Sequence, residues 1–257
     1  MDTTRPQQDQ QLRSAIKVPE VTAVFWVTKV LTTGMGETAS DYLFLNLDPV
    51  LALAIGVVGL VVALVLQFRA RRYVPWIYWF AVVMVAVFGT MAADVARYGL
   101  GVPFLASATF FLALLAVIFI WWYTWEKTLS IHGIHTPRRE RFYWATVLVT
   151  FALGTATGDL TATTLHLGYL ASGVLFAVVI AVPLVAHRWF RLNSILAFWF
   201  AYIITRPLGA SFSDWLALPA ATDGPHWGTG PVTLALTASI VALVGYLNAI
   251  DRKAAKP

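Results

Sequence analysis

Residues 25–41 read FWVTKVLTTGMGETASD, and three positions in this stretch recur along the chain. An aromatic residue precedes Trp26, Gly36 follows that Trp after ten positions, and Asp41 follows the Gly after five. The pattern [FY]-W-x9-G-x4-D occurs four times without a gap, in the stretches 25–41, 78–94, 143–159 and 198–214. Because a pattern that returns at regular intervals is typical of a repeat protein, we expect four copies of one structural unit.

The composition is that of a membrane protein. Of the 257 residues, 59% are hydrophobic and 12% are charged, and the mean hydropathy is +0.72. A soluble domain carries about 25% charged residues, so this chain lacks the polar surface that water requires. The composition excludes a disordered protein, a disulfide scaffold and a nucleic-acid-binding module. The absence of Cys excludes thiolate chemistry, and the first 20 residues are polar, so no cleavable signal is expected.

Eight apolar segments are long enough to cross a bilayer, whose hydrocarbon core takes about 20 residues of helix. These segments are approximately Val21–Leu45, Val50–Phe68, Val74–Ala96, Val102–Trp125, Phe142–Leu165, Gly168–Ala186, Ser194–Leu218 and Val232–Ile250. Runs of this length should be helical, because no water satisfies the backbone inside lipid. The sequence therefore predicts an all-α integral membrane protein with eight transmembrane helices.

Each repeat contains two of these spans, so all four helix hairpins enter the membrane from the same side. The repeats are then parallel, related by an axis along the membrane normal. Their approximate bounds are 20–70, 73–127, 140–190 and 193–251, within a single transmembrane domain of residues 20–251.

Basic residues predict the orientation of these hairpins, because Lys and Arg gather on the cytoplasmic side of a membrane protein. One side carries Arg5, Arg13, Lys17, Arg69, Arg71, Arg72, Lys127, Arg138, Arg139, Arg141, Arg188, Arg191, Arg252, Lys253 and Lys256. The loops of the other side carry Arg97 as their cation, with Asp48 and Asp223. We therefore expect both termini in the cytoplasm, as polar segments 1–19 and 252–257.

The motif Trp and Gly have mainly structural interpretations. Trp26, Trp79, Trp144 and Trp199 lie near the predicted cytoplasmic end of each span, where an aromatic belt anchors a protein in the lipid interface. The glycines Gly36, Gly89, Gly154 and Gly209 follow about 15 Å further along each helix. They are expected to allow close helix packing or a local break that exposes carbonyl groups, which Pro207 would favour in the fourth repeat.

The motif Asp residues point to a shared ionic site. Asp41, Asp94, Asp159 and Asp214 lie at one depth, in the outward third of parallel helices, and ionisable groups inside a membrane are costly enough to indicate function. Glu37 lies one turn before Asp41, on the same helix face. We expect the four Asp residues to converge on one outward-facing cavity between the first helices of the repeats, with the second helices outside, and Glu37 makes the membrane-embedded acids five. They would bind a cation, hold protons, or do both.

Two cations, Lys29 and Arg206, are predicted inside the membrane, in the first and fourth repeats. Lys29 shares a helix face with Glu37 and Asp41, and Arg206 shares one with Asp214. We interpret both as internal counter-ions that compete with a bound cation for the carboxylates. Simple pairing of each with an acid of a neighbouring helix is the alternative.

The ligand types favour a hard cation. Carboxylate, hydroxyl and carbonyl oxygens suit Na⁺, Mg²⁺ or Mn²⁺, so Glu37 and the four motif Asp residues are also candidate metal ligands. The His132–His135 pair in a cytoplasmic loop is a regulatory metal site or, more simply, solvated. The sequence contains no nucleotide-binding glycine loop, no HExxH and no GxSxG, so neither an enzyme nor a cofactor is expected.

These repeats resemble a bacterial family of multi-pass membrane proteins built from four tandem two-helix units of unknown function, each with a signature Trp. The resemblance rests on KVPEVTAVFWVTKVLTTGMGETASDYL, FGTMAADVA, LGTATGDLTA and RPLGASFSDWL and covers roughly residues 17–250. It implies an inner-membrane location and no particular activity.

From the residues themselves we expect a secondary transporter, an exporter of a hard cation such as manganese, magnesium or sodium, coupled to protons at the carboxylates. Its partners would be the lipid bilayer, the cation and protons, without nucleic acid. A non-transporting scaffold or sensor and a cation channel with an Asp ring are the alternatives.

Overall fold

The computed structural model describes residues 16–219 and 224–254. Over these residues the chain is helical, and no strand occurs in them. The predicted features at Arg5, Arg13, Asp223 and Lys256 lie outside the described residues, as do most of the two polar terminal segments.

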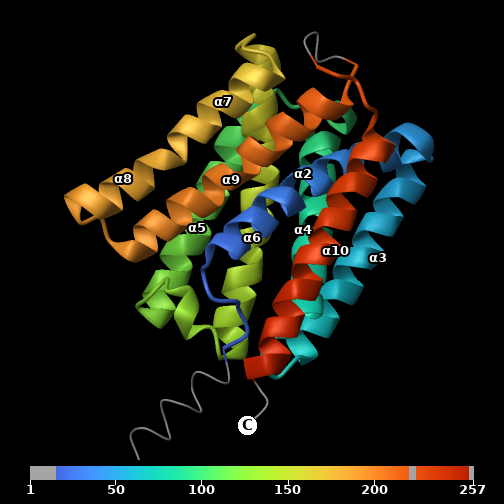
Figure 1. Cartoon of the computed structure of the whole chain (residues 1–257). Coiled ribbons are helices and arrows are strands. Elements are labelled where there is room, and N and C mark those ends of the chain that lie inside the picture. The colour runs from blue at the N-terminus through green and yellow to red at the C-terminus, as the bar shows by residue number, and fades with distance from the viewer. Residues whose placement is uncertain (1–15, 220–223, 255–257) are drawn as a thin grey trace, which may run out of the picture.

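The described residues form nine α-helices, which are labelled in Figure 1. They are α2 (Ala23–Asn46), α3 (Pro49–Arg69), α4 (Pro75–Asp94), α5 (Phe104–Glu126), α6 (Pro137–Asp159), α7 (Tyr169–Val179), α8 (Ala181–Phe190), α9 (Ser194–Ala217) and α10 (Thr229–Ala254), all within the described residues. A π-helical turn extends α4 over Val95–Gly99 and another extends α6 over Leu160–Thr164, and a short 3-10 turn covers Ile131–Gly133.

Seven helices or helix pairs are long and apolar enough to cross a membrane, with α7 and α8 counted as one span. Helix α2 has the necessary length, 24 residues, but it carries Lys29, Glu37 and Asp41, which lower its hydropathy. The structure therefore confirms an all-helical, multi-pass membrane protein. The predicted eighth span is α2, whose charged residues lie among the other helices rather than against lipid.

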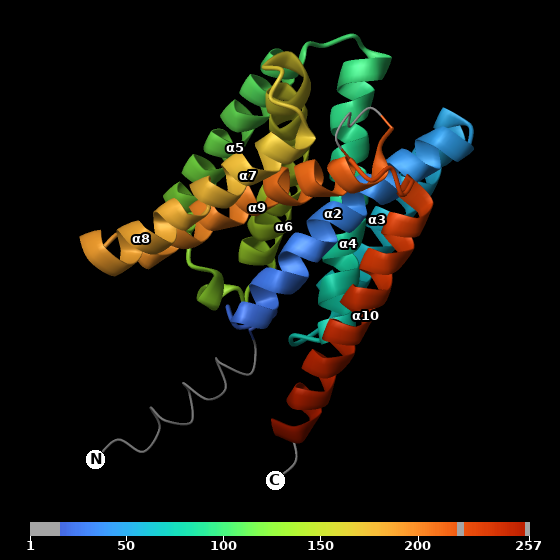
Figure 2. The same ribbon diagram turned by 45° about the horizontal axis from the view of Figure 1, so that its top comes forward.

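The first helices of the four repeats form a closed ring. Helix α2 packs against α4, α4 against α6, α6 against α9, and α9 against α2. The second helix of each repeat lies outside this ring and packs on the first helix of the next repeat: α3 on α4, α5 on α6, α7 on α9, and α10 on α2 (Figures 1 and 2). The prediction of inner and outer helices is confirmed, and α10 closes the circle by returning to the first repeat.

Aromatic contacts show that the four inner helices run in the same direction. The aromatic residue before each motif Trp contacts the Trp of the next repeat. The ring centroids are 5.7 Å apart for Phe25 and Trp79, 5.6 Å for Tyr78 and Trp144, 6.2 Å for Tyr143 and Trp199, and 5.7 Å for Phe198 and Trp26. Such a cycle places the aromatic pairs at one level, and the four motif Asp residues line one cavity further along the same helices, so the repeats are parallel.

These tryptophans contact protein rather than lipid. Trp79, Trp144 and Trp199 are buried, and Trp26 is half-buried. The predicted role as interfacial anchors was wrong, because outer helices cover the end of the ring where the tryptophans lie. Trp122 of α5, for example, packs edge-on against Trp199 at 5.8 Å between ring centroids.

The start of one helix and the continuity of another differ from what the sequence predicts. Helix α6 begins at Pro137, five residues before the predicted start, because Thr136 caps it by accepting a hydrogen bond from the Arg139 amide at 3.3 Å. Helix α9 continues through Pro207 without interruption. The predicted alternative of a local break at Gly36 or Pro207 is absent, because α2 and α9 are each continuous helices, so the glycines serve packing.

Candidate functional site

Each motif glycine lies where its inner helix crosses the next inner helix. A Cβ added at Gly36 would meet Ala86, one at Gly89 would meet Phe151, one at Gly154 would meet Arg206, and one at Gly209 would meet Thr33. Each of these partners stands three residues before the motif Gly of its own repeat. The ring is therefore pseudo-fourfold at the level of single contacts, and the missing side chains let the helices approach closely.

Four columns of side chains run along the inner helices at intervals of four residues, so each column occupies one helix face. The columns are Lys29, Thr33, Glu37 and Asp41 in α2; Val82, Ala86, Thr90 and Asp94 in α4; Val147, Phe151, Thr155 and Asp159 in α6; and Tyr202, Arg206, Ala210 and Asp214 in α9. All of these residues are buried except Asp41 and Asp94, which are half-buried. The columns stack into four layers, and the last layer contains the four Asp residues.

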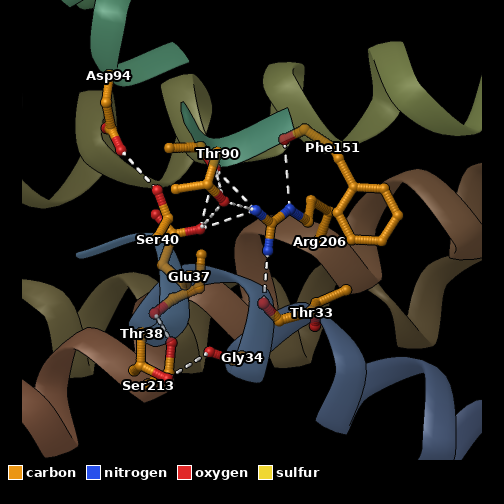
Figure 3. Close-up of polar contacts among 12 residues, drawn as sticks. Thr33, Gly34, Glu37, Thr38, Ser40, Thr90, Asp94, Phe151, Arg206 and Ser213 are labelled. Atoms are coloured by element: carbon orange, nitrogen blue, oxygen red, sulfur yellow. Dashed lines mark hydrogen bonds and ion pairs between the residues drawn. The ribbon is translucent and has the colours of Figure 1, made fainter. Parts of the chain in front are cut away.

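The guanidinium of Arg206 joins all four inner helices (Figure 3). It donates to the carbonyl oxygens of Thr33 at 2.6 Å and Phe151 at 3.3 Å. Its second terminal nitrogen lies 2.8 Å from the Glu37 carboxylate and also donates to the hydroxyl groups of Thr90 and Thr155. Arg206 is fully buried, so this set of acceptors satisfies a cation that would otherwise be costly inside a membrane.

Glu37 completes this network from the opposite side. Its Oε2 accepts from the hydroxyl of Thr90 at 2.9 Å and from that of Thr155 at 3.0 Å, in addition to Arg206. Each hydroxyl has one proton, which it gives to Glu37, and free lone pairs, which accept from Arg206. The terminal nitrogen of Arg206 has two protons for its three acceptors, so one proton is shared, and the network forms a polar floor across the ring.

A cavity of about 520 Å³ lies on one side of this floor. All five predicted carboxylates line it, namely Glu37, Asp41, Asp94, Asp159 and Asp214. Aromatic and apolar residues complete the walls, among them Phe44, Tyr98, Tyr169 and Leu218. The predicted convergence of the motif acids on one cavity is confirmed.

The carboxylates in this cavity are unevenly satisfied. Asp94 accepts a hydrogen bond from Ser40 at 3.4 Å. Asp159 and Asp214 are buried, and Oδ1 of Asp214 has no hydrogen-bond partner among the described residues. Helices α4 and α6 change to π-helical turns directly after Asp94 and Asp159. Such turns often occur at functional sites, and Val95, Tyr98 and Gly99 of the first turn line the cavity.

The acids do not form a compact metal centre. Within the residues that the structure describes, no group of three or more His, Asp or Glu side chains could hold a metal ion. The five carboxylates project from four separate helices into the cavity, and their role as candidate metal ligands stays a prediction. A cation in this cavity would keep part of its hydration shell.

Lys29 lies on the other side of the Arg206 layer and does not reach the carboxylates. Its Nζ stands over the ring of Phe151, 3.9 Å from the centroid, and over that of Tyr202 at 4.2 Å. It is buried and has no hydrogen-bond or ion-pair partner in the described part of the chain. The predicted pairing of Lys29 with Glu37 and Asp41 is wrong, because the Lys29 side chain turns toward the rings of Phe151 and Tyr202. Arg206 pairs with Glu37 rather than with Asp214.

The ring is closed at the end opposite the cavity. Tyr78 of α4 and Tyr143 of the neighbouring α6 bring their hydroxyl oxygens to 2.5 Å from each other. Beyond them, buried Glu140 accepts from Lys17 at 2.7 Å and from Gln67 at 3.0 Å. The segment before α2 thereby packs against the ends of α3 and α6, at the end of the ring remote from the cavity.

Sequence reasoning missed several residues of this site. Thr90 and Thr155 follow their motif Gly directly, as Glu37 does, and this shared position was the signal that could have identified them. Tyr98 and Tyr169 line the cavity from segments outside the repeated pattern, so no spacing identified them.

Fold and site together define a class: a multi-pass helical membrane protein of four parallel repeats around a central carboxylate cavity. The chain belongs to the family described as Repeat of Unknown Function (DUF347), whose model matches residues 24–73, 77–128, 142–193 and 197–253. Each match contains one inner and one outer helix, which confirms the repeat family that the sequence resembles. No curated protein and no solved structure matches the chain significantly.

Proposed function

We propose that this protein is a proton-coupled secondary transporter of a small hard cation, with the five-carboxylate cavity as its binding site. The observation that carries the proposal is that Glu37 and the four motif Asp residues, from four different helices, line a single cavity. Charged groups inside a membrane protein are energetically costly, so a cluster of five acids there favours a role in ion binding.

The distribution of basic residues supports an orientation. Arg69, Arg138 and Arg139 lie at the end of the molecule remote from the cavity, and basic ends of membrane proteins face the cytoplasm. With this orientation the cavity faces outward and both termini lie in the cytoplasm of a cell bounded by this plasma membrane. An outward-open cavity above a closed inner end is one of the two states that an alternating-access exporter requires.

The cavity favours a partly hydrated cargo. Its volume of about 520 Å³ exceeds the space of a bare metal ion, and the carboxylates stand apart. Manganese, magnesium and sodium ions all accept oxygen ligands and bound water. Mg²⁺ in particular retains several waters when proteins bind it.

The contact of Glu37 with Arg206 offers a coupling mechanism. Glu37 lines the cavity and also holds the cation that joins the four inner helices. A proton on Glu37 would cancel its charge and weaken this contact, which would loosen the polar floor. A cation that enters the cavity needs ionised acids, so its binding would release protons.

Transport by the purified protein in liposomes tests this proposal. A gradient of Mn²⁺, Mg²⁺ or Na⁺ is imposed, and an internal pH dye reports proton movement. We expect cation-driven proton flux in the wild type and its loss in Asp159→Asn and Asp214→Asn. Asp48→Asn is the matched control, because Asp48 caps α3 outside the cavity lining and Asn caps a helix equally well.

Three results would contradict the proposal. Folded wild-type protein that moves none of the three cations would favour the scaffold or sensor. Unchanged flux in both Asp variants would remove the cavity acids from the mechanism. Cation currents that do not saturate and move no protons would favour the channel.

A further inference from the structure

A groove of about 390 Å³ lies between α5 and α6, far from the carboxylate cavity. The cavity acid of α6 is Asp159, at the end of that helix, whereas the groove lies along its first turns. One wall comes from Ile118, Trp121 and Trp125 of α5, and the other from Phe142 and Ala145 of α6. The small side chain of Ala145 leaves space for the groove. Beside it, Trp121 and Phe142 are in contact, with ring centroids 5.6 Å apart.

Two guanidinium groups stand at this groove. Arg138 and Arg141 follow each other on the face of α6 that also carries Phe142 and Ala145. Both arginines are exposed. Arg141 donates through its Nε to the Pro137 carbonyl at 3.2 Å, so its terminal N–H groups remain available to a ligand.

One acid, Glu126, is shared between two arginines beside the groove. It accepts from Arg139 at 2.7 Å and forms a longer ion pair with Arg138 at 3.7 Å. Arg138 also stacks on Trp125, 5.3 Å from the ring centroid. The groove therefore combines an apolar floor with a surplus of positive charge at one end.

The position of the groove identifies the ligand chemistry. It lies at the ends of two membrane-spanning helices, where the headgroups of lipids meet the hydrocarbon core. Trp121 and Trp125 are more than half exposed there, as expected of side chains at a lipid interface. A molecule that fits must present an anion beside the arginines and an apolar chain beside the aromatic rings.

We propose that this groove is a binding site for an anionic phospholipid, with the phosphate on Arg138 and Arg141 and an acyl chain along Trp121 and Ala145. Basic pockets between transmembrane helices on the cytoplasmic side suit such headgroups. The paired arginines supply the planar donors that phosphate accepts. This site is independent of the transport proposal.

Quenching of Trp fluorescence by brominated phosphatidylglycerol tests the site, on the full chain in phosphatidylcholine nanodiscs. We expect saturable quenching in the wild type, and about thirtyfold weaker binding in the double variant Arg138→Gln/Arg141→Gln, because two basic contacts to the headgroup are lost. Brominated phosphatidylcholine should give only weak, non-saturable quenching. Arg188→Gln/Arg191→Gln is the matched control, since it removes two exposed cations beside Trp189 outside the groove.

A second variant separates the lipid from its phosphate alone. Ala145→Trp fills the groove and leaves both arginines in place, so it should weaken phosphatidylglycerol binding as well. Inorganic phosphate, added as a competitor, should not displace the lipid. Equal binding in the double variant and the wild type, equal affinity for phosphatidylcholine, or displacement by phosphate alone would each overturn the proposal.

Discussion

Arg206 and Glu37 meet at 2.8 Å although they occupy different positions of the repeat. Arg206 stands three residues before its motif Gly, and Glu37 stands one residue after its own. The contact therefore joins two layers of the ring as well as two repeats, and it is the point where the pseudo-fourfold arrangement becomes asymmetric.

The first prediction concerns this pair. Glu37→Gln should lower the free energy of unfolding by about 3 to 5 kcal/mol, because it leaves a fully buried guanidinium without its counter-charge. Thermal unfolding in detergent measures the effect. The double variant Glu37→Gln/Arg206→Met should recover most of the loss, since no uncompensated charge remains.

Glu126→Gln serves as the control for that cycle. Glu126 also pairs with an arginine, Arg139, at 2.7 Å, but at the partly exposed end of α5. Its loss should cost about 1 kcal/mol or less. A Glu37→Gln protein as stable as Glu126→Gln would mean that the buried pair does not hold the ring.

The second prediction concerns the helix crossings. Gly154→Ala should destabilise the protein by about 1 to 3 kcal/mol, because its Cβ would overlap Arg206 and the ring of Pro207. Gly245→Ala in α10 is the matched change, because the nearest atom to its Cβ belongs to Trp76 at 3.9 Å. That control should gain stability from its better helix propensity. Equal behaviour of the two variants in thermal unfolding would contradict the packing role of the motif glycine.

The third prediction separates stability from function at Lys29. Lys29→Met should leave thermal stability unchanged or higher, because it removes a buried amine that lacks hydrogen-bond partners among the described residues and retains the volume. Cation-driven proton flux should nevertheless fall, because an ionisable group that is costly inside a membrane protein indicates a functional role. A variant with full flux and a lowered unfolding temperature would show that the contacts with Phe151 and Tyr202 are purely structural.

The fourth prediction concerns the closed end of the ring. Tyr78→Phe should cost about 1 to 3 kcal/mol, because it leaves the buried Tyr143 hydroxyl without its partner. The double variant Tyr78→Phe/Tyr143→Phe should be closer to the wild type, since both polar groups are then removed together. Unfolding temperatures of the three variants give the coupling energy directly. A coupling near zero would indicate that water replaces the missing hydroxyl.

The repeat pattern predicted much of this structure. A single spacing, from Trp26 to Gly36 to Asp41, placed the inner helices, made them parallel and brought the four Asp residues to one cavity. It succeeded because the helical period converts a sequence interval directly into a depth and a face. The outer helices followed from hydropathy alone.

The contacts across the ring could not be predicted in the same way. The sequence gives the position of Arg206 along α9, but the reach of its side chain to Glu37 depends on how closely the helices cross. The tryptophans show the same limit. Composition favours a lipid interface for Trp199, whereas the structure satisfies its indole nitrogen with the Leu129 carbonyl at 2.9 Å. The preference of Trp for lipid interfaces is an average over many proteins, whereas Trp199 contacts other helices of this protein.

The return of α10 to α2 has a consequence for biosynthesis. Three of the four interfaces between successive repeats can form as the chain emerges from the ribosome, but the groove of α2 that receives α10 stays empty until the last helix is made. The contact between α10 and α2 is therefore the last of the four to form. Because the start of α2 and the end of α10 lie at the same end of the molecule (Figure 2), a circularly permuted chain that begins at α4 should build the same ring, with a different interface left for last.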